Sequence, residues 1–303
     1  MATEKKYKGI IVPAVTPLTT SLQLDEGALE KMVENFYRHH ISPFILGTTG
    51  ESASLPLPVK KAAIKKSGSI KQAGTILYAG IASSCFVESV ELAHYCFDNG
   101  VDAVAATLPS YYVLTDEEMK RYFISLADAV KAPLIIYNIP ATTHMSIPLK
   151  LIDELSHHPN IVATKDSERS DDRLNESLSL WKNRTDFGHF LGWAARSAVA
   201  LASGSDGLIP STGNLVPVIY EIMLQAIRDN NIAKAEAMQQ LSDQYGNLYQ
   251  QGRTLGSSLW ALKVLMKEVR LCEAIVMPPL QPGTKEDAQQ LIEQFHSIRQ
   301  QVI

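Results

Sequence analysis

Residues 161–167 read Ile-Val-Ala-Thr-Lys-Asp-Ser and form a short apolar run that ends on a lysine. An apolar run of this length, bounded by Asn160 and by Asp166, predicts a strand that is buried along most of its length. Lysine is rarely fully buried, because its ammonium group loses hydration there. Two interpretations are therefore open from these residues. Either the strand stops at Thr164 and Lys165 points to solvent, or Lys165 is buried for a chemical purpose.

The composition is that of an ordinary globular protein. The chain has 303 residues, of which 46% are hydrophobic and 20% are charged, and its net charge is -4. This length suits one large α/β barrel or two smaller domains. The mild acidity and the lack of lysine or arginine runs argue against binding to nucleic acid or to a membrane surface.

Targeting and redox features predict a cytoplasmic protein. No apolar stretch approaches the ~20 residues that span a membrane. Residues 1–6 lack the apolar core of a signal peptide. The three cysteines, Cys85, Cys96 and Cys272, have no CxxC spacing. They are expected to be reduced thiols that pack rather than bind a ligand.

Short apolar runs recur at intervals of about 20 to 35 residues, with amphipathic stretches between them. Eight such β-then-α units in about 230 residues predict an α/β protein with the (β/α)8 TIM-barrel fold. A doubly wound sheet is the alternative, but no GxGxxG follows the first run and no Walker lysine loop is present. The eight runs are Ile10–Val15, Pro43–Leu46, Ile76–Ile81, Ala103–Thr107, Leu134–Tyr137, Ile161–Thr164, Phe187–Leu191 and Gly207–Pro210.

The stretches between the runs have the period of a helix, with apolar residues at i, i+3, i+4 and i+7. Gly100 is expected to end one of these helices. Thr115 with Glu118 predicts a capping box at the start of the next. Two of the apolar stripes are Leu29, Met32, Val33 and Phe36, and Val90, Ala93, His94 and Phe97.

From residue 230 onwards the pattern is helical almost throughout. We expect residues 1–229 to form the barrel domain and residues 230–303 to form a C-terminal helical region packed on it. The run Ala274–Met277 has the composition of a short strand, and Pro278 ends it.

In a barrel of this kind the chemistry lies at the carboxyl ends of the strands. The second strand ends in residues 47–51, Gly-Thr-Thr-Gly-Glu. Their glycines permit a tight turn and their hydroxyl and N–H groups suit a carboxylate, although a plain turn also explains them. Tyr111, Tyr137 and Ser211 follow other strands. A tyrosine there is also explained as a packing group with a hydrated hydroxyl.

Lys165 would meet these groups at one mouth of the barrel. A lysine amine has a pKa of ~10.4 and is almost fully protonated at neutral pH. Burial lowers that pKa, so the amine can attack a ketone and form an imine. The protonated imine then accepts electrons from the neighbouring carbon, and a tyrosine can carry the protons.

Four separated motifs, in this order and spacing, resemble the dihydrodipicolinate synthase / N-acetylneuraminate lyase superfamily. They are Gly47–Glu51, the pair Tyr111-Tyr112, Tyr137–Pro140 and Lys165, and Gly207–Asn214 fits the same pattern. The resemblance covers essentially the whole chain. It implies a class I, pyruvate-type aldolase or lyase and no metal or organic cofactor.

The resemblance implies a role for each matching residue. Lys165 would form the Schiff base with the keto carbon of pyruvate or another 2-oxo acid, and Tyr137 would be the general acid and base. Thr48 would connect Tyr137 to Tyr111, which in many members reaches across a subunit interface. The carboxylate would be held by Gly47, Thr49 and the backbone of this turn, and Ile209 would line the pyruvate pocket.

The chain departs from dihydrodipicolinate synthases at Thr142. Those enzymes usually place an arginine two residues after the motif that corresponds to Tyr137–Pro140, where it holds the carboxylate of the second substrate. A neutral hydroxyl cannot form that bidentate pair. This difference argues against aspartate semialdehyde as the second substrate.

Sialic acid lyases resemble the Tyr137–Pro140 motif more closely, but they carry an acidic pair after the seventh strand. Here residues 192–196 read Gly-Trp-Ala-Ala-Arg, with alanine at both acidic positions, and Gly192 is a candidate for substrate binding. Ser167 and Ser211 match hydroxyl positions that bind the sugar chain in those lyases.

Arg196 and His144 are candidates for holding the distal end of the substrate. A solvated helix residue is an equally good interpretation of Arg196. A loop histidine without a catalytic role is the simpler interpretation of His144.

The preferred function is an aldolase or dehydratase for a 2-keto-3-deoxy sugar acid or a similar 2-oxo acid. The alternatives are 4-hydroxy-tetrahydrodipicolinate synthase, N-acetylneuraminate lyase, and a family member that binds a 2-oxo acid without catalysis. A metal-dependent aldolase is disfavoured, because the doublets at residues 39–40 and 157–158 are adjacent histidines that diverge around a helix. The resemblance also implies a homo-oligomer, a dimer of dimers.

Overall fold

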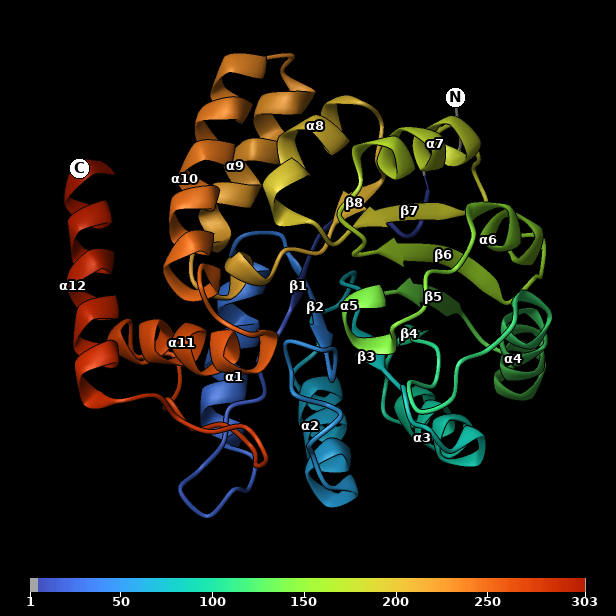
Figure 1. The fold of residues 1–303 in the computed structure, drawn as a ribbon, viewed down its shortest axis with the longest axis horizontal. Helices are drawn as coiled ribbons and strands as arrows, with labels where there is room; N and C mark the ends of the chain where they lie inside the picture. The colour runs from blue at the N-terminus through green and yellow to red at the C-terminus, as the bar shows by residue number, and fades with distance from the viewer. Residues whose placement is uncertain (1–4, 303) are drawn as a thin grey trace.

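The structure is a computed structural model that describes residues 5–302. Its centre is a closed barrel of parallel strands in which each strand pairs with the next and β8 pairs with β1 (Figure 1). All eight predicted runs form strands, so the predicted TIM barrel is confirmed. The strands are β1 (Gly9–Pro13), β2 (Ser42–Ile45), β3 (Tyr78–Gly80), β4 (Ala103–Ala106), β5 (Leu134–Asn138), β6 (Ile161–Asp166), β7 (Gly188–Leu191) and β8 (Gly207–Leu208).

Helices follow the strands and cover the outside of the barrel, and three more helices complete the chain. In Figure 1 the last of them, α12, lies on one side of the molecule and α4 on the opposite side. The helices are α1 (Glu26–Arg38), α2 (Leu57–Ser69), α3 (Phe86–Asp98), α4 (Asp116–Val130), α5 (Pro140–Thr143), α6 (Leu149–Leu155), α7 (Asp171–Trp181), α8 (Ser197–Ala202), α9 (Pro217–Arg228), α10 (Ile232–Gln250), α11 (Leu255–Glu268) and α12 (Lys285–Val302), with short 3-10 turns at Ala194–Arg196 and Ser211–Asn214.

Local signals place several helix ends where the sequence predicts them. Thr115 and Glu118 form the predicted capping box at the start of α4. Gly100 follows α3 with a left-handed φ of 86°, as a helix-ending glycine does. The predicted buried stripe of α3 is wrong for His94, which is exposed, because Ser89 and Cys96 share the inward face instead.

Successive side chains of each barrel strand point alternately into two packed layers. One set of side chains fills the barrel interior, and the intervening set packs against the helices. Side chains of the first set form one cluster: Tyr7, Ile11, Phe44, Tyr78, Ala103, Ala105, Ile135, Ala163, Phe190 and Ile209. Since Ala163 and Ile135 point inward, Lys165 and Tyr137, two residues further along β6 and β5, point into the same interior.

The C-terminal helices are bound to the barrel by a fully buried ion pair. Lys263 on α11 lies 2.5 Å from Glu51, and neither side chain is exposed. The Lys263 Nζ also donates to the carbonyl oxygens of Thr16, at 2.8 Å, and Ile275, at 2.6 Å. The Glu51 carboxylate accepts a hydrogen bond from the N–H of Met277. This network joins the turn after β2 to the region beyond residue 230.

The run Ala274–Met277 forms no strand, so that prediction is wrong. Met277 instead donates its N–H to Glu51 outside any sheet. The division of the chain at residues 229 and 230 stays a prediction. None of the helices within residues 5–302 is long and apolar enough to cross a membrane.

Replacing Lys263 with methionine is expected to lower the free energy of unfolding by about 3–5 kcal/mol, because Glu51 is left buried without a counter-charge. Urea unfolding monitored by circular dichroism measures the change. The control is Lys267→Met on the same helix, whose ion pair with Glu273 is about half exposed and contributes about 0–1 kcal/mol. Equal losses in the two variants would contradict the role given to the buried pair.

Candidate active site

Lys165 is buried at the mouth of the barrel, so the solvent-facing interpretation of this residue is wrong. It is 4% exposed, and β6 continues past it to Asp166. Its Nζ lies 3.8 Å from the centre of the Tyr137 ring and 4.9 Å from the centre of the Phe44 ring. The register of the barrel sets this arrangement, because Tyr137 on β5 pairs directly with Lys165 on β6.

The surroundings of Lys165 change its protonation. Burial lowers the pKa of the amine below the ordinary lysine value, because the ammonium form loses its hydration. Tyr137 opposes this shift, but burial outweighs it. This shift raises the fraction of the amine that is neutral, which is the nucleophilic form.

Tyr137 is the second buried ionisable group of the site. Burial is the largest effect and raises its pKa, but the charge of the Lys165 ammonium form and the hydrogen bonds with Thr48, Lys165 and Ser167 together outweigh burial, so the net pKa is lowered. Thr48 adds to the lowering, since its Oγ1 lies 3.3 Å from the Tyr137 hydroxyl. A phenol that shares its proton with a neighbouring hydroxyl is suited to proton transfer.

The turn after β2 brings a pair of free backbone donors to the same mouth. Within residues 5–302, the N–H groups of Thr48 and Thr49 donate to no protein acceptor, whereas those of Gly50 and Glu51 donate within the turn. Two adjacent free N–H groups form a concave site for an anion. Gly47 permits this course, because a Cβ there would lie only 3.3 Å from the ring of Phe44.

A cavity of about 550 Å³ opens beside these residues. Thr48, Tyr137, Ser110 and Thr142 are among the residues that line it. Lys165 is not among the lining residues, but its Nζ lies 3.8 Å from the centre of the Tyr137 ring, which does line the cavity. No arginine lines the cavity in the part of the chain that the structure describes.

Ser167, Gly192 and Ile209 follow β6, β7 and β8, respectively. Ser167 contributes to the lowered pKa of Tyr137, which places its hydroxyl near that phenol. A Cβ on Gly192 would lie 2.1 Å from the Ser167 Oγ, so only glycine fits where β7 passes this residue. Ile209 is 4% exposed and belongs to the interior cluster of the barrel.

Ser211 is held by a buried tyrosine of the C-terminal region. Its Oγ lies 2.7 Å from the hydroxyl of Tyr249 on α10, and the Oγ1 of Thr212 lies 3.0 Å from the same hydroxyl. Tyr249 is a neighbour of Ser211 that the sequence analysis missed, because nothing in its local sequence on α10 indicates a contact with the barrel.

Arg196 and His144 lie farther out. Arg196 donates two hydrogen bonds, at 2.8 and 2.7 Å, to the carboxylate of Asp171 at the start of α7. Its guanidinium also lies 5.3 Å from the centre of the Trp193 ring. His144 ends α5 with a left-handed φ of 58° and is exposed. Neither residue lines the cavity.

Within one chain, Tyr111 does not line the cavity beside Tyr137. It is 79% exposed and packs edge-on against Tyr112, with the ring centres 4.9 Å apart. No hydrogen bond joins it to Thr48 within residues 5–302.

Two further features were missed by the sequence analysis. Phe44 forms one wall beside Lys165, and its inward position on β2 follows from strand alternation. Asn138 and Asp166 directly follow Tyr137 and Lys165 and are buried. For Asn138 and Asp166, the available signal was a polar residue at the end of an apolar strand.

A family model described as the dihydrodipicolinate synthetase family matches residues 6–298. The chain is 28% identical to a DapA-like lyase of Pyrococcus abyssi, over 83% of this chain and 85% of that protein. It is 30% identical to the 4-hydroxy-tetrahydrodipicolinate synthase of Acidiphilium cryptum, over 77% of this chain and 80% of that enzyme. It is 26% identical to YagE of Escherichia coli, provisionally named a 2-dehydro-3-deoxy-D-gluconate aldolase, over 91% of this chain and 92% of that protein.

Solved structures share the fold over nearly the whole chain. The crystal structure of YagE in complex with pyruvate superposes with a TM-score of 0.91 at 24% identity, over 97% of this chain and 99% of that one. The dihydrodipicolinate synthase of Bacteroides thetaiotaomicron superposes with a TM-score of 0.91 at 25% identity, over 97% of this chain and all of that one (100%).

The amine of Lys165 is expected to react at lower pH than an ordinary lysine, whose pKa is ~10.4. The burial that lowers its pKa raises the neutral, reactive fraction at every pH below that value. Carbamylation by cyanate at a series of pH values, followed by peptide mapping, gives the midpoint, with the exposed lysines of the same digest as reference. A midpoint at or above the ordinary value would contradict the assignment.

Proposed function

Because this chain belongs to the dihydrodipicolinate synthetase family, whose named relatives are lyases and aldolases, we propose that it is a class I aldolase of 2-oxo acids. Lys165 forms the imine, and the substrate is a 2-keto-3-deoxy sugar acid or a similar 2-oxo acid. The observation that carries the proposal is the buried amine of Lys165, 3.8 Å from the centre of the Tyr137 ring at the barrel mouth.

The first half of the reaction forms the imine. The neutral amine of Lys165 attacks the keto carbon of the substrate, and a proton moves from nitrogen to oxygen. Tyr137 then donates its proton to the hydroxyl of this adduct, water leaves, and a protonated imine remains beside the Tyr137 phenolate. The substrate carboxylate is held by the free N–H groups of Thr48 and Thr49. This contact places the keto carbon within reach of the amine.

The second half breaks the carbon–carbon bond. Tyr137, now a phenolate, takes the proton of the hydroxyl on carbon 4, the bond between carbons 3 and 4 breaks, and its electron pair moves toward the protonated imine nitrogen to give the enamine. An aldehyde leaves. Tyr137 returns the proton to carbon 3, which restores the protonated imine, and water hydrolyses the imine to release pyruvate and regenerate Lys165 and the Tyr137 phenol. Thr48 supports these transfers through its contact with the Tyr137 hydroxyl.

The outer part of the cavity favours a neutral, hydroxylated substrate chain. Thr107, Ser110 and Thr142 present hydroxyl groups there, and no arginine among the described residues lines it. Among the described residues, the cation that lines the cavity is Lys60, which interacts with Glu88. A second carboxylate would have no arginine for a bidentate pair, whereas sugar hydroxyls can exchange hydrogen bonds with these side chains. This supports a sugar acid over aspartate semialdehyde, although several relatives are named 4-hydroxy-tetrahydrodipicolinate synthase.

We also propose that the protein is a cytoplasmic homo-oligomer, arranged as a dimer of dimers. The support is the exposed apolar segment of Tyr111, Tyr112 and Val113, which are 79%, 72% and 84% exposed. A second copy packed on this segment would remove it from water and could bring Tyr111 to the site of its neighbour.

Incubation with a panel of 2-keto-3-deoxy sugar acids is expected to release pyruvate, measured by coupled reduction of the pyruvate to lactate. Lys165→Ala should abolish release, and Tyr137→Phe should slow it by about 10²–10⁴-fold, because the proton carrier is lost. Aspartate semialdehyde with pyruvate is the comparison reaction. Release that persists in Lys165→Ala would overturn the imine mechanism, and turnover of the comparison reaction alone would favour the synthase alternative.

A further inference from the structure

A second polar cluster lies on the outer side of the strands that carry Tyr137 and Lys165. Asn138 pairs in register with Asp166, one step beyond the pair of Tyr137 and Lys165. Side chains alternate along a strand, so Asn138 and Asp166 point away from the barrel interior. Both are buried, with 0% and 3% exposure. The mechanism of the reaction uses neither side chain.

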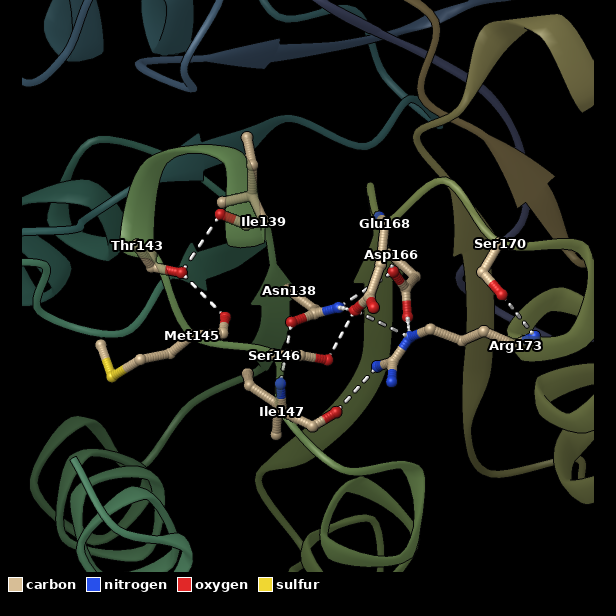
Figure 2. Close-up of polar contacts among 10 residues, drawn as sticks. All are labelled: Asn138, Ile139, Thr143, Met145, Ser146, Ile147, Asp166, Glu168, Ser170 and Arg173. Atoms are coloured by element: carbon tan, nitrogen blue, oxygen red, sulfur yellow. Dashed lines mark hydrogen bonds and ion pairs between the residues drawn. The ribbon is translucent and has the colours of Figure 1, made fainter. Parts of the chain in front are cut away.

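The amide of Asn138 binds two carboxylates. Its Nδ2 donates to the Oδ1 of Asp166 at 3.1 Å and to the Oε2 of Glu168 at 3.0 Å (Figure 2). Two carboxylates this close repel one another and need a cation, above all where water is excluded. Burial raises the pKa of Asp166, and Arg173 opposes that shift.

Arg173 on α7 supplies the cation, and only 12% of its side chain is exposed. Its Nε donates to the Oδ2 of Asp166 at 2.6 Å and lies 3.4 Å from Glu168. Its Nη2 donates to the carbonyl oxygen of Ile147 at 2.8 Å (Figure 2). One planar guanidinium thus joins the residue after Lys165 to a segment that follows β5.

That segment comprises residues 139–147, and we call it the β5–α6 segment. Its last residue is bonded to the residue that precedes it, because the N–H of Ile147 donates to the Oδ1 of Asn138 at 3.0 Å. Ser146 Oγ donates to Glu168 at 2.6 Å, and Thr143 Oγ1 donates to the carbonyls of Ile139 and Met145 (Figure 2).

The β5–α6 segment also reaches the cavity. Thr142 and Thr143 line it, and His144 ends the short helix of the same segment. The polar cluster is therefore connected to three parts of the site: the end of β5 with Tyr137, the end of β6 with Lys165, and the segment that lines the cavity.

We propose that Arg173 is a positioning residue that couples the β5–α6 segment to the ends of β5 and β6. It neutralises Asp166 and Glu168 and holds Ile147, so that Lys165, Tyr137 and the cavity wall keep one fixed geometry. The effect on catalysis rests on the proposed function, whereas the coupling itself does not. A misplacement of about 1 Å at a reacting group can cost about 100-fold in rate.

The test compares Arg173→Met, Arg173→Lys and the control Arg169→Met. Arg169 is an exposed residue four positions before Arg173. The coupling is measured by hydrogen–deuterium exchange over residues 139–147. The catalytic geometry is tested by the rate at which borohydride traps pyruvate on Lys165, at a temperature below the unfolding transition of each variant.

Arg173→Met is expected to speed exchange in the β5–α6 segment and to slow trapping by about 10–100-fold. Arg173→Lys keeps the charge but cannot bond to both Asp166 and Ile147. Its trapping rate should therefore lie between the rates of the wild type and of Arg173→Met. Arg169→Met should match the wild type. If Arg173→Met does not fold, the lysine variant decides the question by the same two measurements.

Unchanged exchange over residues 139–147 would overturn the coupling. Faster exchange with trapping at the wild-type rate would overturn the positioning role and leave Arg173 a structural residue. If the wild type itself traps no pyruvate, the proposed function fails, and the exchange comparison then decides the coupling without it.

Discussion

The site depends on one constraint: a lysine amine is held out of water against the ring of a tyrosine. The closed barrel imposes it, because β5 and β6 pair Tyr137 with Lys165 and direct both side chains to the interior. The interior cluster beside them is largely apolar and includes Phe44, whose ring centre lies 4.9 Å from the Lys165 Nζ. Loss of hydration disfavours the ammonium form, so the packing of the barrel lowers the pKa of the amine.

Polar networks outside the barrel interior hold this arrangement in place. The ion pair of Glu51 and Lys263 fixes the turn after β2 from the side of the C-terminal helices. The Arg173 cluster fixes the ends of β5 and β6 from the side of α7. Both are buried, and both would leave an unpaired charge if one partner were removed. The inner face of β5 and β6 thus carries Tyr137 and Lys165, and their outer face carries Asn138 and Asp166 of the Arg173 cluster.

Much of this could be predicted from the sequence. The eight apolar runs and their spacing predicted the barrel, and the position of Lys165 at a strand end predicted its place at the mouth. The turn at residues 47–51 was predicted because glycine and threonine have direct local consequences. These features depend on residues that are neighbours along the chain or repeat with a fixed period.

Contacts between residues distant in sequence could not be predicted in this way. Nothing local to Lys263 indicates that it pairs with Glu51, and the bond from Arg173 to Ile147 depends on how α7 packs beside β6. Arg196 shows the same limit, since its partner Asp171 lies 25 residues earlier in the chain. The helical stripe of α3 was misplaced around its axis because the buried face includes Ser89, which carries no apolar signal.

The central claim is that Lys165 forms an imine with a 2-oxo acid, and trapping that imine tests it most directly. The protein is incubated with pyruvate and sodium borohydride, its intact mass is measured, and the adduct is located by peptide mapping. The account predicts a single reduced pyruvyl adduct on Lys165 that is absent from Lys165→Ala. An adduct on another lysine, or none in the folded protein with pyruvate or with longer 2-oxo acids, would contradict it.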